Sequence, residues 1–260
     1  MKLFYKLTRR LACALCFVLP VAFLFGVSAQ AQEAAPPAVV ETFTCSYNPG
    51  QDEDDLMSAR DYYVKQAEKA GVTLGPAYTW SLLKGDVNFD FVWLAPHQNF
   101  SAFAAAFDAE AGASALADVP ARFDAVADCR AGLGTIHALH VEEGASASPS
   151  FITSNACRLH EGMGAEQMRD LGGHISAVMA ELGDAAPQAT YAIAPTTRGP
   201  NMPDMVIFSV NESATSYAEF VAQLYGTDAG QRLIRHFNML GNCGNAMWAG
   251  QQVIEGPPAE

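Results

Sequence analysis

Residues 41–141 alternate between strand-like and helix-like patterns of hydrophobic positions. The segment opens with Glu41–Asn48, whose Thr and aromatic content is typical of a strand. After the turn at Pro49-Gly50, apolar residues recur at helical spacing until Gly71 ends the predicted helix. The patterns that follow predict strands at Tyr78–Lys84 and Phe89–Pro96, helices at Phe100–Phe107 and Ala121–Ala127, and a last strand at Gly132–Val141.

Residues 151–256 show the same order of patterns. Their clearest signal is a helix with apolar residues at helical spacing from Met168 to Leu182, ended by Gly183. The other patterns predict strands at Phe151–Leu159, Thr190–Thr197, Asp204–Val210 and Asn245–Ile254, and helices at Tyr217–Leu224 and Gly230–Met239.

Four short matches relate the two segments and predict an internal duplication. Each match lies 112 to 114 residues after its counterpart, and the matches keep their order along the chain. The matched pairs are Cys45 with Cys157, Tyr78–Trp80 with Tyr191–Ile193, Asp90–Trp93 with Asp204–Ile207, and Phe123–Cys129 with Phe237–Cys243. We therefore expect one unit at 41–141 and a second at 151–256, with residues 142–150 as a polar linker and loose ends at 32–40 and 257–260.

Strand-helix-strand-strand-helix-strand, twice, is the split β-α-β layout of ferredoxin-like domains. With this order of elements the chain resembles the α/β-barrel superfamily that includes the NIPSNAP proteins and the small antibiotic-biosynthesis monooxygenases. The resemblance implies an α+β fold in which two tandem ferredoxin-like repeats pack sheet against sheet as a fused α/β barrel. More narrowly, Cys45–Gly50 and Phe89–Leu94 are similar to a family of exported, uncharacterised bacterial proteins.

Four cysteines follow the N-terminal apolar segment, and four cysteines allow three pairings. In the ferredoxin-like layout the first and last strands of each unit are antiparallel neighbours, which favours Cys45–Cys129 and Cys157–Cys243. Each bridge would close about 85 residues and stabilise the fold by about 4 kcal/mol in the chain-entropy model. A metal site or a reactive thiol is the alternative, but these four cysteines show no C-x-x-C spacing.

The N-terminus has the pattern of a secretory signal peptide. Four basic residues precede an apolar run at Leu11–Val27, and Ser28-Ala29-Gln30-Ala31 follows. We predict cleavage between Ala31 and Gln32, which places the mature protein in the periplasm or outside the cell. An uncleaved membrane anchor is the alternative, but the apolar run is at the short end of what spans a bilayer. No stable membrane insertion is therefore expected after cleavage.

The charge balance argues against nucleic acid as a partner. The chain has 15 Lys and Arg against 28 Asp and Glu, and removal of residues 1–31 takes away four of the basic residues and no acid. So acidic a protein repels phosphate backbones and anionic lipid surfaces. The partner classes that remain are a small apolar molecule or another periplasmic protein.

Trp80, Trp93 and His97 are the candidate site residues. The two tryptophans lie on predicted strands, where they either fill the barrel interior or line an apolar pocket. His97 ends a predicted strand and precedes Gln98-Asn99, so it could transfer a proton, ligate haem or simply cap the next helix. The sequence shows no phosphate-binding glycine loop, nucleophile elbow or metal-ligand spacing, and no metal is expected.

Two functions are compatible with these patterns. One is a non-catalytic periplasmic module that binds a small apolar ligand or a partner protein in or around the barrel, without a cofactor. The other, implied by the resemblance, is an enzyme of the monooxygenase or haem-handling kind. The enzyme hypothesis requires an asymmetric polar group in one cavity, and His97 is the one candidate. The sequence therefore favours the binding module.

Overall fold

The computed structural model describes residues 38–142, 145, 150–196 and 202–256. The predicted signal peptide with its cleavage site after Ala31, the tail at 257–260 and most of the predicted linker lie outside these residues. Within them, the predicted order of strands and helices is found in both halves. The first strand begins at Ala38, inside the predicted loose N-terminus, and the first strand of the second half begins at Ser150.

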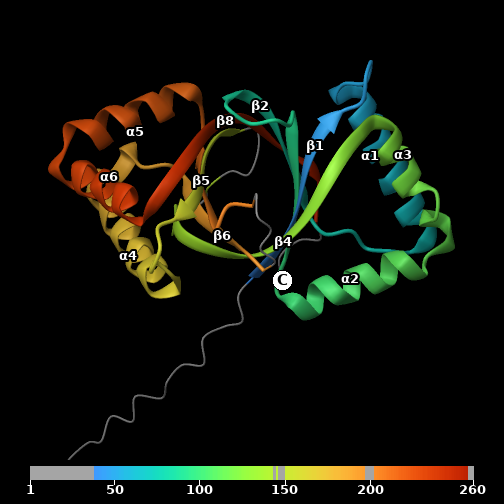
Figure 1. The fold of residues 1–260 in the computed structure, drawn as a ribbon. Helices are drawn as coiled ribbons and strands as arrows, with labels where there is room; N and C mark the ends of the chain where they lie inside the picture. Colours follow the sequence, from blue (N-terminus) through green and yellow to red (C-terminus); the bar gives the residue numbers. More distant parts are fainter. Residues whose placement is uncertain (1–37, 143–144, 146–149, 197–201, 257–260) are drawn as a thin grey trace, which may run out of the picture. The chain divides into compact units, whose positions relative to one another are not determined.

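Eight antiparallel strands in the described part of the chain close into a barrel (Figure 1). They are β1 Ala38–Tyr47, β2 Ala77–Gly85, β3 Phe91–His97, β4 Ala127–Val141, β5 Ser150–Leu159, β6 Ala189–Pro195, β7 Met205–Asn211 and β8 Gly241–Ile254. The order around the barrel is β1-β3-β2-β8-β5-β7-β6-β4. The order β4-β1-β3-β2 of the first half therefore recurs as β8-β5-β7-β6 in the second.

Helices cover the outside of the barrel on two sides (Figure 1). They are α1 Glu53–Ala70, α2 Phe100–Gly112, α3 Val119–Val126, α4 Ala165–Leu182, α5 Ala214–Gly226 and α6 Asp228–Leu240, with 3-10 turns at Ser114–Leu116 and Gly183–Ala185. The first three lie beside the strands of the first half and the last three beside those of the second. Among the residues described, no helix is long and apolar enough to cross a membrane.

β4 and β8 begin four to five residues earlier than the hydrophobic pattern predicts. β4 begins at Ala127 rather than Gly132, and β8 at Gly241 rather than Asn245. The first residues of β4 after Ala127 are exposed and show no alternation, but they pair with β1 from Tyr47 onward. Pairing with the neighbouring strand, and not the local pattern, therefore determines where these strands start.

The disulfides lie at matching positions in the two halves. Cys45 of β1 is opposite Cys129 of β4, and Cys157 of β5 is opposite Cys243 of β8. Both pairs are bonded, as the sequence predicts, across sequence separations of 84 and 86 residues. The shared register allows the two halves to be compared residue by residue.

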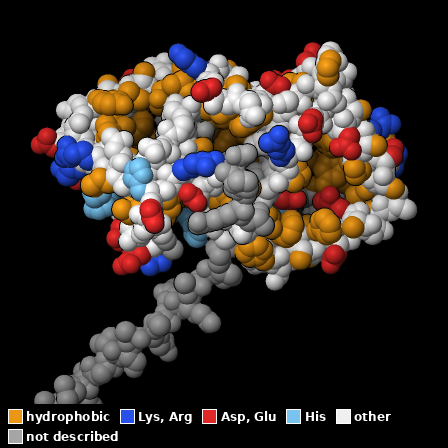
Figure 2. All heavy atoms as spheres, viewed as in Figure 1, with side chains coloured by type: hydrophobic (Ala, Val, Ile, Leu, Met, Phe, Trp, Pro, Cys, Tyr) orange, Lys and Arg blue, Asp and Glu red, His pale blue; other side chains and the backbone are white. Residues whose placement is uncertain are grey.

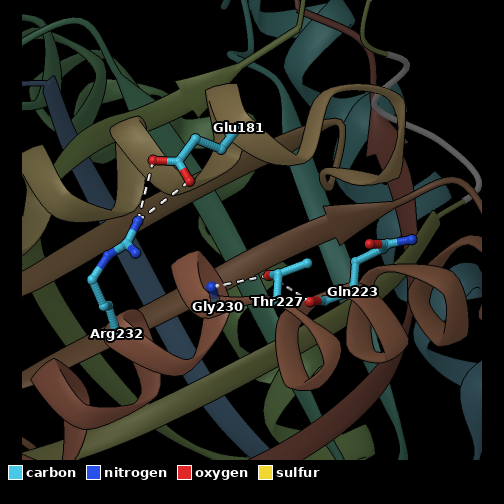
Figure 3. Close-up of polar contacts among 5 residues, drawn as sticks. All are labelled: Glu181, Gln223, Thr227, Gly230 and Arg232. Carbon is cyan, nitrogen blue, oxygen red and sulfur yellow. Dashed lines mark hydrogen bonds and ion pairs between the residues drawn. The ribbon is translucent and has the colours of Figure 1, made fainter.

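The second half has a continuous apolar core between its helices and its sheet, which includes Ile175. Polar contacts hold the helices above this core (Figure 3). Arg232 of α6 donates to Glu181 of α4 at 3.3 Å, and the Thr227 hydroxyl accepts from the Gly230 amide at 3.2 Å to cap α6. In the first half the buried apolar residues on the helix side form three smaller clusters instead.

Candidate functional site

Alternate side chains along each barrel strand point into the lumen and outward to the helices. A cavity lies on each side of the sheet. The lumen pocket, of about 430 Å³, is inside the barrel and includes Tyr78, Trp80, Tyr191 and Phe208 in its wall. The helix-side pocket, of about 540 Å³, lies between the outer face of β1, β3 and β4 and the helices α1, α2 and α3. Both volumes are typical of small-molecule sites.

Aromatic and aliphatic side chains form most of the wall of the helix-side pocket. They include Phe43, Leu56, Leu74, Phe91, Trp93, Phe103, Phe107, Val119, Phe123 and Ile254. The ring of Phe123 packs edge-on against Trp93, with centroids 5.7 Å apart, and against Tyr63 at 6.2 Å. Figure 2 shows this side of the molecule hollowed, with hydrophobic side chains inside the hollow and acidic side chains around it.

Four polar side chains converge on this apolar pocket: Glu41 of β1, Tyr63 of α1, His97 at the end of β3 and Glu110 of α2. The Nε2 atom of His97 lies 3.9 Å from Oε2 of Glu41, and the His97 side chain is 14% exposed. This distance is too long for a hydrogen bond, and Nε2 is buried without a partner among the described residues. Across the pocket, the Tyr63 hydroxyl interacts electrostatically with the Glu110 carboxylate.

Burial moves the pKa of each of these groups toward its uncharged form. It raises the pKa of Glu41, and the charge of Glu110 raises it further. It also raises the pKa of Tyr63 and the pKa of Glu110, although the interaction with the Tyr63 hydroxyl opposes the shift at Glu110. Burial lowers the pKa of His97 below its usual 6.5. At neutral pH His97 is therefore a neutral imidazole that can accept a proton.

The second half carries uncharged residues at all four equivalent positions. β1 pairs with β3 in the same register as β5 with β7, and the helices compared have equal lengths, so the equivalence is direct. The replacements are Thr153 for Glu41, Ile175 for Tyr63, Asn211 for His97 and Leu224 for Glu110. Ile175 is 1% exposed, and Leu224 packs against the same apolar core. The second half thus has packed core where the first half has a cavity lined by ionisable groups.

The three residues predicted to line one pocket lie on two faces of the sheet. Trp93 and His97 line the helix-side pocket, whereas Trp80 lines the lumen pocket. This corrects the prediction of a single pocket. The alternative that His97 caps the next helix is also wrong, because Oδ1 of Asn99 accepts from the Ala102 amide at 2.9 Å and caps α2.

The sequence patterns do not single out Glu41, Tyr63 or Glu110. Glu41 and Tyr63 lie in segments whose patterns predict only a strand and a helix, and Glu110 lies beyond the predicted helix Phe100–Phe107, which the structure extends to Gly112. A signal does exist in the duplication. At the offset of 114 residues, Glu110 corresponds to Leu224. The first copy therefore has a charged residue where the second copy has a leucine of its core. An acid at a position that the other unit uses for its core departs from the local pattern and marks a candidate functional residue.

The described residues form no metal site, since no group of three or more His, Cys, Asp or Glu is arranged to hold an ion. Haem, which the superfamily resemblance implies, would need an axial ligand and counter-charges for its two propionates. His97 offers an unpaired nitrogen, but the other charged groups on the described wall are the acids Glu41, Glu110 and Asp124. Acids beside propionates repel them, so the pocket fits haem poorly.

Several solved structures of other proteins match most of the chain. A candidate monooxygenase from Fusobacterium nucleatum subsp. nucleatum has a TM-score of 0.58 at 11% identity, over 86% of this chain and 97% of its own. A second candidate monooxygenase, from Lactobacillus acidophilus, has a TM-score of 0.53 at 10% identity, over 85% and 97%. A candidate chlorite dismutase has a TM-score of 0.50 at 8% identity, over 84% and 96%.

These likenesses show that the chain has the dimeric α/β-barrel fold, as the resemblance in element order implied. No protein-family model and no curated protein matches the sequence, and the narrower likeness to exported bacterial proteins finds no support. Because a shared fold does not determine activity, the function has to be argued from the pocket itself.

Proposed function

We propose that this protein is an enzyme of the monooxygenase-like kind and that the helix-side pocket of the first half is its active site. The observation that carries the proposal is the set Glu41, Tyr63, His97 and Glu110, present in one half and replaced by uncharged residues in the other. Burying ionisable groups in an apolar cavity costs free energy, and two halves that only packed would not need it. Two proteins of similar fold are candidate monooxygenases, which favours an enzyme over a non-catalytic module.

The wall of the pocket selects the class of substrate. Aromatic rings such as Trp93, Phe103 and Phe123 suit an apolar, ring-containing molecule. Glu41 and Glu110 repel an anion, so a substrate with a carboxylate or phosphate is disfavoured. We infer an uncharged organic substrate with an acidic position, such as a phenol or a methylene group activated by neighbouring rings or carbonyls.

His97 is the general base of the proposed reaction. Its neutral Nε2 accepts a proton from the substrate, and the carboxylate of Glu41 at 3.9 Å stabilises the imidazolium that forms. The deprotonated carbon then gives electrons to O₂. For an activated methylene, one oxygen atom becomes the carbonyl of the product and the other leaves as water with the two hydrogens of the methylene. The reaction balances without a resident cofactor, and the absence of a cofactor stays a prediction.

The pair of Tyr63 and Glu110 is proposed to orient the substrate. The two side chains interact electrostatically and come from two different helices, α1 and α2, whereas His97 ends β3. A polar group in this part of the pocket can fix one end of a substrate while its reactive carbon faces Nε2.

We further propose that the protein is exported to the periplasm and that its two halves arose by duplication of one unit. The predicted cleavage between Ala31 and Gln32 would release the protein into the periplasm, and two disulfides suit an oxidising compartment. Tandem ferredoxin-like units at 41–141 and 151–256 are supported by the repeated strand order and the repeated disulfide register. A small apolar molecule is the proposed partner.

Oxygen uptake tests the proposed function. The protein is mixed with a panel of uncharged phenols and activated methylene compounds, with a carboxylated analogue of each as control, and no cofactor is added. The expected result is consumption of one O₂ per substrate oxidised, and no uptake with the anionic analogues. The proposal fails if no panel member is oxidised while added haem gives a Soret band that His97→Asn abolishes, because that outcome identifies a haem protein.

A further inference from the structure

The lumen pocket is separate from the helix-side pocket and is not used by the proposed reaction. Toward the β2–β3 connection the lumen is filled: Phe89 stacks on Trp248, with ring centroids 5.6 Å apart, and Nε1 of Trp248 donates to Ser154 at 2.9 Å. Beyond this plug lies the cavity of about 430 Å³, within the range of small-molecule sites.

The wall of the lumen pocket is aromatic and uncharged. Phe208 lies 4.7 Å from Trp80 and 5.2 Å from Tyr191 between ring centroids, and Val40, Leu94 and Ile152 complete the apolar surface. The described residues that line it include no Lys, Arg, His, Asp or Glu. An ionised ligand would therefore lose its hydration without gaining a partner of opposite charge.

Two tyrosine hydroxyls stand out in this apolar wall. Tyr78 of β2 pairs with Leu94, and Tyr191 of β6 pairs with Phe208, which occupies the position of Leu94 in the second half. The two tyrosines are therefore equivalent residues of the duplication. They interact electrostatically across the lumen, and burial raises the pKa of both.

Neither hydroxyl has an acceptor among the residues that the structure describes, and neither is among the atoms buried without a partner, so both are accessible from the cavity. A ligand that fills the cavity displaces water from them and must supply an acceptor, because a buried donor left unpaired costs free energy. Two such donors facing one cavity match a single acceptor oxygen, which has two lone pairs. The cavity thus offers a polar anchor inside an otherwise apolar volume.

We propose that the lumen pocket binds an uncharged apolar molecule with a ketone or quinone oxygen, and that Tyr78 and Tyr191 donate to this oxygen. The apolar body of the ligand packs against Trp80 and Phe208. This site is independent of the helix-side pocket and needs no catalytic group.

Contact quenching of tryptophan fluorescence tests the lumen site, because each pocket contains its own tryptophan. The probe is para-bromoacetophenone, whose bromine quenches an indole that it touches and whose ketone is the proposed acceptor. In Trp93→Phe, where Trp80 and Trp248 remain, we expect saturable quenching. In Trp80→Phe, where Trp93 and Trp248 remain, this phase should be lost, because Trp248 does not line the lumen pocket. The matched control ligand is para-bromobenzoate, which has the same ring with a negative charge and should not quench through Trp80.

The double variant Tyr78→Phe/Tyr191→Phe identifies the anchor. Loss of two hydrogen bonds should weaken binding of para-bromoacetophenone roughly tenfold or more, with the melting temperature unchanged because neither hydroxyl bonds to a described residue. Tyr225→Phe, at an exposed tyrosine of α5, is the control. Unchanged affinity of the double variant, equal binding of the benzoate, or no quenching through Trp80 overturns the proposal. Quenching through Trp93 alone would overturn the proposed lumen site but would not contradict the proposed active site in the helix-side pocket.

Discussion

Burial acts on single side chains in opposite ways in the two halves of the barrel. In the first half, His97 and Glu110 keep ionisable groups in an apolar cavity, and the pKa of each shifts toward the neutral form. In the second half the same positions carry Asn211 and Leu224. Asn211 donates to the Phe151 carbonyl at 3.2 Å, and Leu224 packs into the core. The shifted pKa values of these groups are therefore a consequence of burying polar residues in an incompletely packed cavity.

The pKa of His97 predicts the pH dependence of the activity. A general base must be unprotonated, and burial lowers the pKa of His97 from 6.5. We therefore expect the acidic limb of the kcat/KM profile to lie below pH 6.5. Glu41→Gln should move the limb further down, because the carboxylate that stabilises the imidazolium is lost. Kinetics across the acidic range check this; a limb above pH 6.5 would identify a different base.

Glu110→Leu, which introduces the residue of the second half, is expected to raise the melting temperature at neutral pH. The pKa of Glu110 is raised above 4.5 in the folded protein, so any stability it contributes is present below that value and lost as pH rises through the folded pKa. The gain from Glu110→Leu should therefore shrink in acid. Thermal unfolding at neutral and acidic pH measures it, with Asp108→Leu on the same helix as control. A gain independent of pH would contradict this account of Glu110.

Among the elements, α2 differs from its counterpart α5 in how it packs. α2 and α5 both have 13 residues and begin after a side-chain cap, but α5 buries Phe220 whereas α2 has no buried residue. Phe100 and Phe107 of α2 are 44% and 61% exposed. The weak packing of α2 accompanies the open volume beneath it, which is lined by Phe103, Phe107 and Glu110.

Hydrogen exchange should distinguish these two helices. Local opening requires little free energy where few apolar contacts are lost, so the amides of α2 should exchange faster than those of α5. A substrate found in the oxygen-uptake screen should slow exchange in α2 and leave α5 unchanged. Exchange resolved to peptides by mass spectrometry measures both effects. Equal protection of the two helices in the free protein would show that α2 is not the weakly held wall of the site.

At the scale of the whole molecule, the duplication carries most of what the sequence predicts. The repeated order of elements leads to the ferredoxin-like layout, and that layout leads to both disulfides, which the structure has at matching register positions. The placement of Trp80 and Trp93 could not be obtained in this way. Side chains alternate along a strand, so a one-residue change in register moves a residue to the other face, and the pattern does not determine the register of β2 against β3.

The cavity itself could not be predicted either. Its volume depends on how closely α2 approaches the sheet, and the alanine-rich sequence of α2 is compatible with a packed or an open position. An acid of the site could in principle be found from the sequence, because aligning the two copies places Glu110 of the first copy at the position of Leu224 in the second. They become a site only once the fold brings α1, α2 and β1 together around His97.

The predicted export is tested on protein from the native host. The basic start, the apolar run and Ala31 predict a mature N-terminus at Gln32. N-terminal sequencing of the protein from a periplasmic fraction should begin there. A start at Met1 in a membrane fraction would show that the segment is an uncleaved anchor.

The kinetics of His97→Asn test the central claim most directly, because asparagine is the residue that the second half carries at this position and adds no bulk. Loss of a general base lowers turnover by roughly 10²–10⁴-fold. We expect kcat to fall by at least about a hundredfold with KM little changed, while near-ultraviolet circular dichroism stays that of the folded protein. His160→Asn, at an exposed histidine outside both pockets, should keep full activity. Full turnover by His97→Asn on a substrate that the unmodified protein oxidises would contradict the account.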